Sequence, residues 1–131
     1  MRGLDSNVLV RLLTQDDARQ ARRVDRLLRD AKRAGDRLYV DVVVLCELVW
    51  VLQSAYRHDR AAIAEALEAI LQAPEIVVED RDAARRALDD YRAGPGDFSD
   101  YLIGHRNVAA GCVATDTFDR RLKGDTKFSQ L

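Results

Sequence analysis

The sequence is poor in the residues that most often bind transition metals, with only two histidines and two cysteines among its 131 residues. Cys46 and Cys112 both lie in apolar runs, where a free thiol behaves as a small buried hydrophobe. Without a cysteine-rich framework, the chain is expected to belong to a reducing compartment. His105 has no second histidine or cysteine at ligand spacing, which favours a polar surface or supporting role over zinc binding.

An excess of charge of one sign is also missing, because 21 lysines and arginines nearly balance 22 acidic residues. Any affinity for nucleic acid must therefore come from local patches. Aromatic residues make up only 6% of the chain and form no obvious base-stacking platform. The sequence shows no signal peptide and no apolar run long enough to span a bilayer, so a soluble cytoplasmic protein without a membrane partner is expected.

The pattern of apolar residues predicts short strands that alternate with helices. The chain is large enough for one globular domain, residues 1–131, and contains no repeat or linker. Strands are expected at 2–5, 37–40, 75–79 and 112–115; helices are expected at 6–13, 15–35, 42–56, 60–72 and 80–91 and from residue 97 onward. This order predicts an α/β domain with a short, mostly parallel central sheet flanked by helices on both faces.

The most informative stretch is GDFSDYLIGHRNVAAGCVATDTFD, Gly96 to Asp119. Asp97 and Asp100 are three residues apart, so their carboxylates share one face in the first turn of the expected helix. Like charges so close repel unless a cation or a proton lies between them. Asp116 or Asp119 would follow the strand 112–115, at the end where open α/β sheets bind ligands. The stretch therefore predicts half of a metal site, although Asp97 is also consistent with a helix cap.

Two earlier acids are candidates for the other half. Asp5 stands at a strand-to-helix junction, where Asp5 or Ser6 is also a suitable helix N-cap. Glu47 is the only acid in the apolar helix 42–56 and is expected to point into the protein or a cleft. An ionised carboxylate there is costly unless it is paired or binds a metal. A buried ion pair with an arginine is the alternative.

Taken together, the acids suggest a particular chemistry. If the ends of the first and fourth strands are neighbours, four or five carboxylates converge without any histidine or cysteine. Such a hard oxygen cluster suits Mg²⁺ or Mn²⁺ better than Zn²⁺. Its best-known work is on phosphate esters, where the cation polarises the phosphoryl oxygen and activates the attacking water.

Four short motifs resemble those of PIN-domain nucleases, in the same order. Leu4 to Leu9 is similar to their opening LDTNVL, with Ser6 in place of threonine, and Leu45 to Leu48 is similar to the second motif, an acid in an apolar helix. Asp97 to Ile103 resembles DFxDxLI, and Thr117 to Asp119 resembles TFD. The small size of the chain resembles the VapC-type toxins of bacterial toxin–antitoxin pairs.

The resemblance implies a Mg²⁺- or Mn²⁺-dependent endoribonuclease, the toxin of a type II toxin–antitoxin system. Its partners would be an RNA substrate, a cognate antitoxin and a second copy in a homodimer. The matching metal ligands are Asp5, Glu47, Asp97, Asp100 and Asp119, of which all but Asp97 are also expected to be catalytic. Ser6 retains a hydroxyl that could orient a metal-bound water, and Asn7 is expected to lie beside it, just outside the ligands. Asp116 matches no acid that the family requires.

Basic residues close in sequence to these acids are consistent with two roles. They either offset the acidic charge and hold the RNA backbone, or form solvated basic turns; they are Arg11, Arg120, Arg121 and Lys123. Two other functions also fit the sequence. One is an RNA-processing nuclease without an antitoxin, and the other is a non-catalytic PIN-like binding module.

Overall fold

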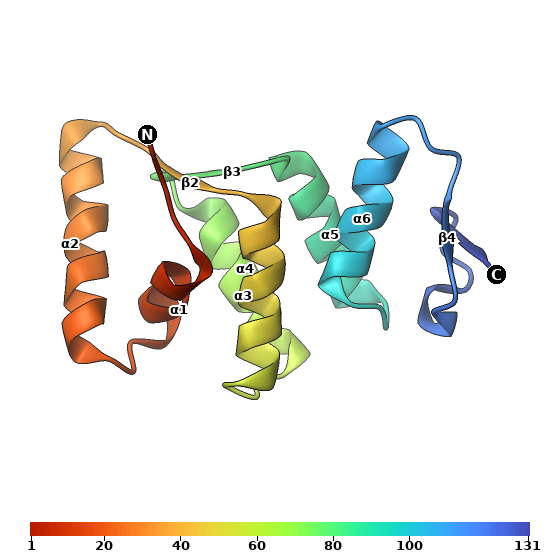
Figure 1. Cartoon of the computed structure of the whole chain (residues 1–131), viewed down its shortest axis with the longest axis horizontal. Helices are drawn as coiled ribbons and strands as arrows, with labels where there is room; N and C mark the ends of the chain where they lie inside the picture. The colour runs from red at the N-terminus through yellow and green to blue at the C-terminus, as the bar shows by residue number, and fades with distance from the viewer. The chain divides into compact units, whose positions relative to one another are not determined.

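The computed structural model describes all 131 residues, and they form two compact units. The N-terminal unit is Met1–Glu79 and the C-terminal unit is Asp80–Leu131. Figure 1 shows that helices make up most of both units, with short strands between them. Every strand pairing is parallel. None of the helices is long and apolar enough to cross a lipid bilayer.

The N-terminal unit contains a three-stranded parallel sheet and four helices. Its elements are β1 (Arg2–Gly3), α1 (Ser6–Thr14), α2 (Ala18–Ala34), β2 (Leu38–Val40), α3 (Val42–Ser54), α4 (Arg60–Gln72) and β3 (Ile76–Val78). The strand order is β1-β2-β3, and two helices connect each strand to the next. Parallel strands require such crossovers because the chain must return to the end of the sheet where the first strand began before the next strand can start.

Aspartates begin all four helices of this unit. Each lies in extended backbone and accepts a hydrogen bond from the backbone N–H three residues later, at 2.8 to 3.0 Å; they are Asp5, Asp17, Asp41 and Asp59. The side chain satisfies an amide that has no partner within the helix. The apolar faces bury Leu9, Leu38, Leu48, Leu52 and Ile63, each at most 1% exposed.

The C-terminal unit pairs two helices and adds a small second sheet. Its elements are α5 (Arg81–Ala93), α6 (Phe98–Ala109), β4 (Thr115–Thr117), the 3-10 turn η1 (Arg120–Leu122) and β5 (Phe128–Gln130). Tyr91 and Phe98 meet edge to face, with ring centroids 6.3 Å apart. β4 and β5 are parallel partners. Gly104 of α6 leaves room for the Phe128 ring, because an added Cβ would lie 2.8 Å from it.

The α/β class and the parallel sheet predicted from the sequence are confirmed, with local differences. The strand expected at 112–115 lies instead at Thr115–Thr117, and Cys112 is exposed rather than buried. β5 was not predicted. Both strands are three residues long and largely polar, TDT and FSQ, so neither carries the apolar signal that marks a buried strand.

The packing around Gly96 gives a prediction. An added Cβ there would lie 2.7 Å from Leu122 Cδ2 and 2.9 Å from Tyr101 Cζ. Because both side chains are buried, Gly96→Ala is expected to lower the free energy of unfolding by about 1–3 kcal/mol through overpacking. Urea unfolding measures it. Gly3→Ala is the matched control, since nothing lies within 4 Å of a Cβ there; equal stability of the two variants would contradict this packing.

Candidate functional site

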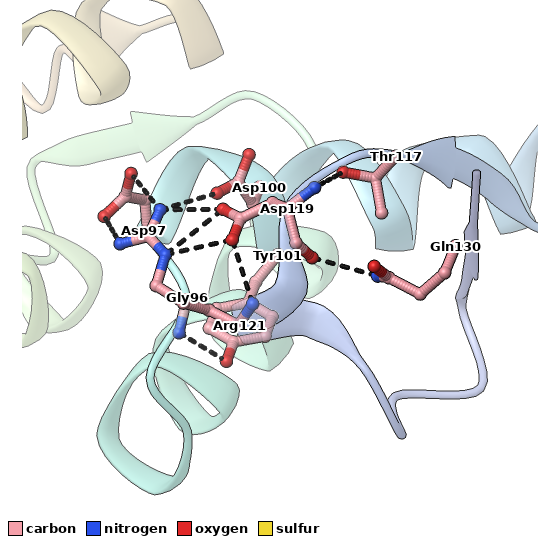
Figure 2. A network of polar contacts seen from close by, with 8 residues as sticks. All are labelled: Gly96, Asp97, Asp100, Tyr101, Thr117, Asp119, Arg121 and Gln130. Carbon is pink, nitrogen blue, oxygen red and sulfur yellow. Dashed lines mark hydrogen bonds and ion pairs between the residues drawn. The ribbon is translucent and has the colours of Figure 1, made fainter.

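Three carboxylates of the C-terminal unit surround one guanidinium group (Figure 2). The Nη2 atom of Arg121 lies 2.7 Å from Asp119 Oδ2, 3.2 Å from Asp97 Oδ2 and 4.0 Å from Asp100 Oδ2. Its Nη1 atom donates to Asp97 Oδ1 at 3.3 Å, and its Nε atom to Asp119 Oδ1 at 3.1 Å. We call these three acids and Arg121 the carboxylate cluster.

Asp97 begins α6 but does not cap it with its side chain. Its backbone is extended, as at an N-cap, yet its carboxylate makes no capping hydrogen bond and is turned to Arg121 instead. Asp100 follows in the first turn and accepts a hydrogen bond from the backbone of Asp97. The helix cap that the sequence also allowed for Asp97 is therefore only half made. Both carboxylate oxygens of Asp97 accept hydrogen bonds from the guanidinium of Arg121.

Asp119 is held by the two strands of the second sheet. Its backbone N–H donates to Thr117 Oγ1 at 3.0 Å, and its carbonyl oxygen accepts from Gln130 Nε2 at 2.9 Å. The carboxylate also caps η1, accepting from the Arg121 backbone N–H at 2.9 Å. The sequence did not indicate the contribution of Gln130, because β5 carries no recognisable strand pattern.

Buried groups beneath the carboxylate cluster fix its loops. The Gly96 N–H, directly before Asp97, donates to Tyr101 Oη at 2.9 Å in a buried hydrogen bond (Figure 2). Leu122, directly after Arg121, is 2% exposed. Gly96 is close to both side chains. A packed layer of Gly96, Tyr101 and Leu122 therefore ties together the segments that carry the acids.

The electrostatics of the cluster are uneven. Hydrogen bonds that Arg121 donates lower the pKa of Asp119, and its hydrogen bonds to Asp119 and Asp97 raise the pKa of Arg121. The pKa of Asp100 is raised instead, first by its partial burial and then by repulsion from Asp97. One guanidinium thus compensates Asp119 well and Asp100 poorly.

The two remaining predicted acids, Asp5 and Glu47, lie in the N-terminal unit. Ser6 Oγ donates to Glu47 Oε2 at 2.9 Å, and Asp5 is the adjacent residue in the chain. Asp5 uses one oxygen, Oδ1, to cap α1 at Val8, so the capping role is real. The other carboxylate oxygen of Asp5, Oδ2, is not used by this cap.

The expectation that the Glu47 side chain points into the protein is wrong. Its side chain is exposed, as are Val43 at 63% and Trp50 at 68% on the same face of α3. Leu45, Leu48, Val49 and Leu52 supply the buried face, so α3 has apolar residues on both its core side and its solvent side. Glu47 is bonded to a serine hydroxyl and not to a buried arginine.

The other predicted residues are placed differently. Arg11 is engaged in its own unit, donating to Asp16 Oδ1 at 2.9 Å and to Tyr56 Oη at 3.1 Å. Arg120 and Lys123, which flank the cluster in sequence, are exposed, as is Asn7. Phe118, next to Asp119 in the chain, is 80% exposed. Asp116 lies exposed on β4, and its contacts do not include Arg121.

His105 makes a structural contact, in agreement with the expected supporting role. Its Nε2 atom lies 2.6 Å from Asp90 Oδ2, and Lys127 Nζ lies 3.3 Å from the same oxygen. Lys127 also pairs with Asp125 at 2.8 Å. These polar contacts connect α5 and α6 to the segment that leads into β5.

The donor chemistry of the carboxylate cluster fits a hard divalent cation. Three carboxylates offer only oxygen ligands, which Mg²⁺ and Mn²⁺ prefer. As the side chains stand, no group of three histidines, cysteines or acids is gathered at metal-ligand spacing. In this structure the carboxylates hold the guanidinium of Arg121 as their cation.

The chain thus has an α/β fold with parallel strands and a carboxylate cluster whose oxygens suit a hard cation. Comparison with known families identifies it further, because the family model of the PIN domain matches residues 4–124. The chain belongs to the PIN domain family. It is also similar to the VapC ribonuclease of Aquifex aeolicus (strain VF5), with 28% identity over 123 residues, covering 94% of this chain and 90% of that protein.

The geometry separates the roles of Asp119 and Asp116. Asp119→Asn is expected to weaken Mn²⁺ binding about tenfold or more, because it removes a charged ligand from the carboxylate cluster. Asp116→Asn is the matched control and is expected to bind Mn²⁺ like the wild type, since Asp116 is exposed outside the cluster. Isothermal titration measures both. A larger effect at Asp116 than at Asp119 would reverse this assignment.

Proposed function

We propose that this protein is a metal-dependent endoribonuclease and acts as the toxin of a type II toxin–antitoxin system. The observation that carries the proposal is the carboxylate cluster, in which Asp97, Asp100 and Asp119 surround the one guanidinium of Arg121. Membership of the PIN domain family and similarity to a VapC ribonuclease support the same chemistry. RNA is the proposed substrate, and an antitoxin and a second copy of the chain are the proposed partners.

The proposed ligands of Mg²⁺ or Mn²⁺ are Asp5, Glu47, Asp97, Asp100 and Asp119. When bound, such a cation polarises the phosphoryl oxygen and lowers the pKa of the attacking water. The proposal treats residues 1–131 as one PIN-like domain, so that both groups of acids serve one reaction. Non-additive losses in double variants that combine Asp5 or Glu47 with Asp119 are the test of that shared role.

The remaining residues orient these acids and hold the RNA. Ser6 fixes the Glu47 carboxylate by its hydrogen bond, and Thr117 and Gln130 fix the backbone of Asp119. Arg120 and Lys123 are exposed, and they are proposed to contact phosphate oxygens, which basic side chains bind without regard to base sequence. Arg11 is a weaker candidate because Asp16 and Tyr56 already engage it.

Replacing either acid of the N-terminal unit is expected to stop RNA cleavage. Asp5→Asn keeps the capping ability of the side chain but removes its charge, so α1 should stay intact. Glu47→Gln keeps the shape and the acceptor for Ser6. Each should lower the rate of Mg²⁺- or Mn²⁺-dependent cleavage more than about a hundredfold, above the range typical of residues outside the ligands.

Asp17→Asn is the matched control, because Asp17 caps α2 in the same way that Asp5 caps α1. It should cleave RNA like the wild type, and circular dichroism should show the same helix content in all variants. EDTA should abolish cleavage by the wild type. Wild-type rates in Asp5→Asn and Glu47→Gln would overturn the assignment and favour a non-catalytic binding module.

A further inference from the structure

Arg121 occupies the oxygens that a metal ion would use. Both carboxylate oxygens of Asp119 accept hydrogen bonds from its side chain, at 2.7 to 3.2 Å, and both oxygens of Asp97 accept at 3.2 and 3.3 Å. Figure 2 shows the guanidinium between Asp97 on one side and Asp100 and Asp119 on the other. A cation bound by all three acids and this guanidinium therefore compete for the same lone pairs.

The guanidinium leaves the cluster undercompensated. Three carboxylates face one positive charge, and Asp100, at 4.0 Å, makes an ion contact with Arg121 but no hydrogen bond. Like charges that remain unpaired repel, so the site retains an attraction for a cation of higher charge. A divalent ion supplies that charge in a smaller volume than the planar guanidinium does.

Arg121 can also leave without disturbing the core. Its side chain is 48% exposed, and Leu122, the next residue, carries the buried packing of η1. An open pocket next to it is lined by Gly94, Pro95, Tyr101, Lys123 and Gly124. Ion pairs this exposed are individually weak, so the guanidinium can be exchanged at little cost.

We propose that Arg121 and the divalent cation are alternative partners of the same carboxylates. In the metal-free protein Arg121 holds Asp97 and Asp119 together, and when a cation binds it turns away from them. This inference rests on the metal site of the proposed function and adds that the chain carries its own competitor for that site. Arg121 is thus a positioning residue of the metal-free state.

Mn²⁺ binding by the purified full chain at low ionic strength is the test, measured by isothermal titration and by the loss of the free Mn²⁺ signal in electron paramagnetic resonance. Low salt is used because exposed charges are screened otherwise. Removing the competitor in Arg121→Gln is expected to tighten Mn²⁺ binding by about threefold to tenfold. Arg121→Lys keeps the charge but loses the bidentate fork, so its Mn²⁺ affinity should lie between those of the wild type and Arg121→Gln.

Arg86→Gln controls for the lost charge, because Arg86 is exposed on α5 of the same unit and has no role in the proposed site; it should change Mn²⁺ affinity less than about twofold. Metal-free Arg121→Gln should unfold at lower urea concentration than the wild type, and saturating Mn²⁺ should remove that difference. Mn²⁺ binding by Arg121→Gln and Arg121→Lys that is no tighter than by Arg86→Gln overturns the proposal while leaving the nuclease assignment intact. Absence of Mn²⁺ binding in the wild type overturns both.

Discussion

Repulsion between neighbouring carboxylates is the constraint on which the site depends. Asp97 and Asp100 share the first turn of α6, and Asp119 follows β4 beside them. Three such groups repel one another unless a cation or a proton lies between them. In this structure Arg121 supplies the positive charge, but it lies 4.0 Å from Asp100 Oδ2, and burial and the neighbouring Asp97 raise the pKa of Asp100. The proposed divalent cation answers the same constraint more completely.

Asp97 differs from the aspartates that begin the helices of the N-terminal unit. Asp5, Asp17, Asp41 and Asp59 all use their side chains to cap helices. Asp97 occupies the same backbone position at α6 without the capping bond, so both its oxygens are directed to a cation. Buried Tyr101 and Leu122 pack against Gly96 and fix the loop that precedes Asp97 without using the Asp97 carboxylate.

The sequence predicted the parts of the structure that local chemistry determines. α4 was predicted at its observed bounds, 60–72, because its amphipathic pattern is a strong local signal. The exposure of Glu47 could not be read, since an apolar helix with apolar residues on its solvent face looks buried from sequence alone. The pairing of Arg121 with Asp97, 24 residues away, depends on how η1 packs beneath α6 and leaves no periodic pattern. β5 was also missed. It pairs with β4 but is largely exposed, so it carries no apolar pattern that marks a strand.

The most direct test of the account is a crystal structure of the protein grown with Mn²⁺, with the ion located by its anomalous scattering. The account predicts a Mn²⁺ ion on the carboxylates of Asp97, Asp100 and Asp119, at the place where Arg121 now binds, with the guanidinium turned away from them. An ion bound elsewhere, or no ion while Arg121 keeps its contacts with Asp97 and Asp119, would contradict it.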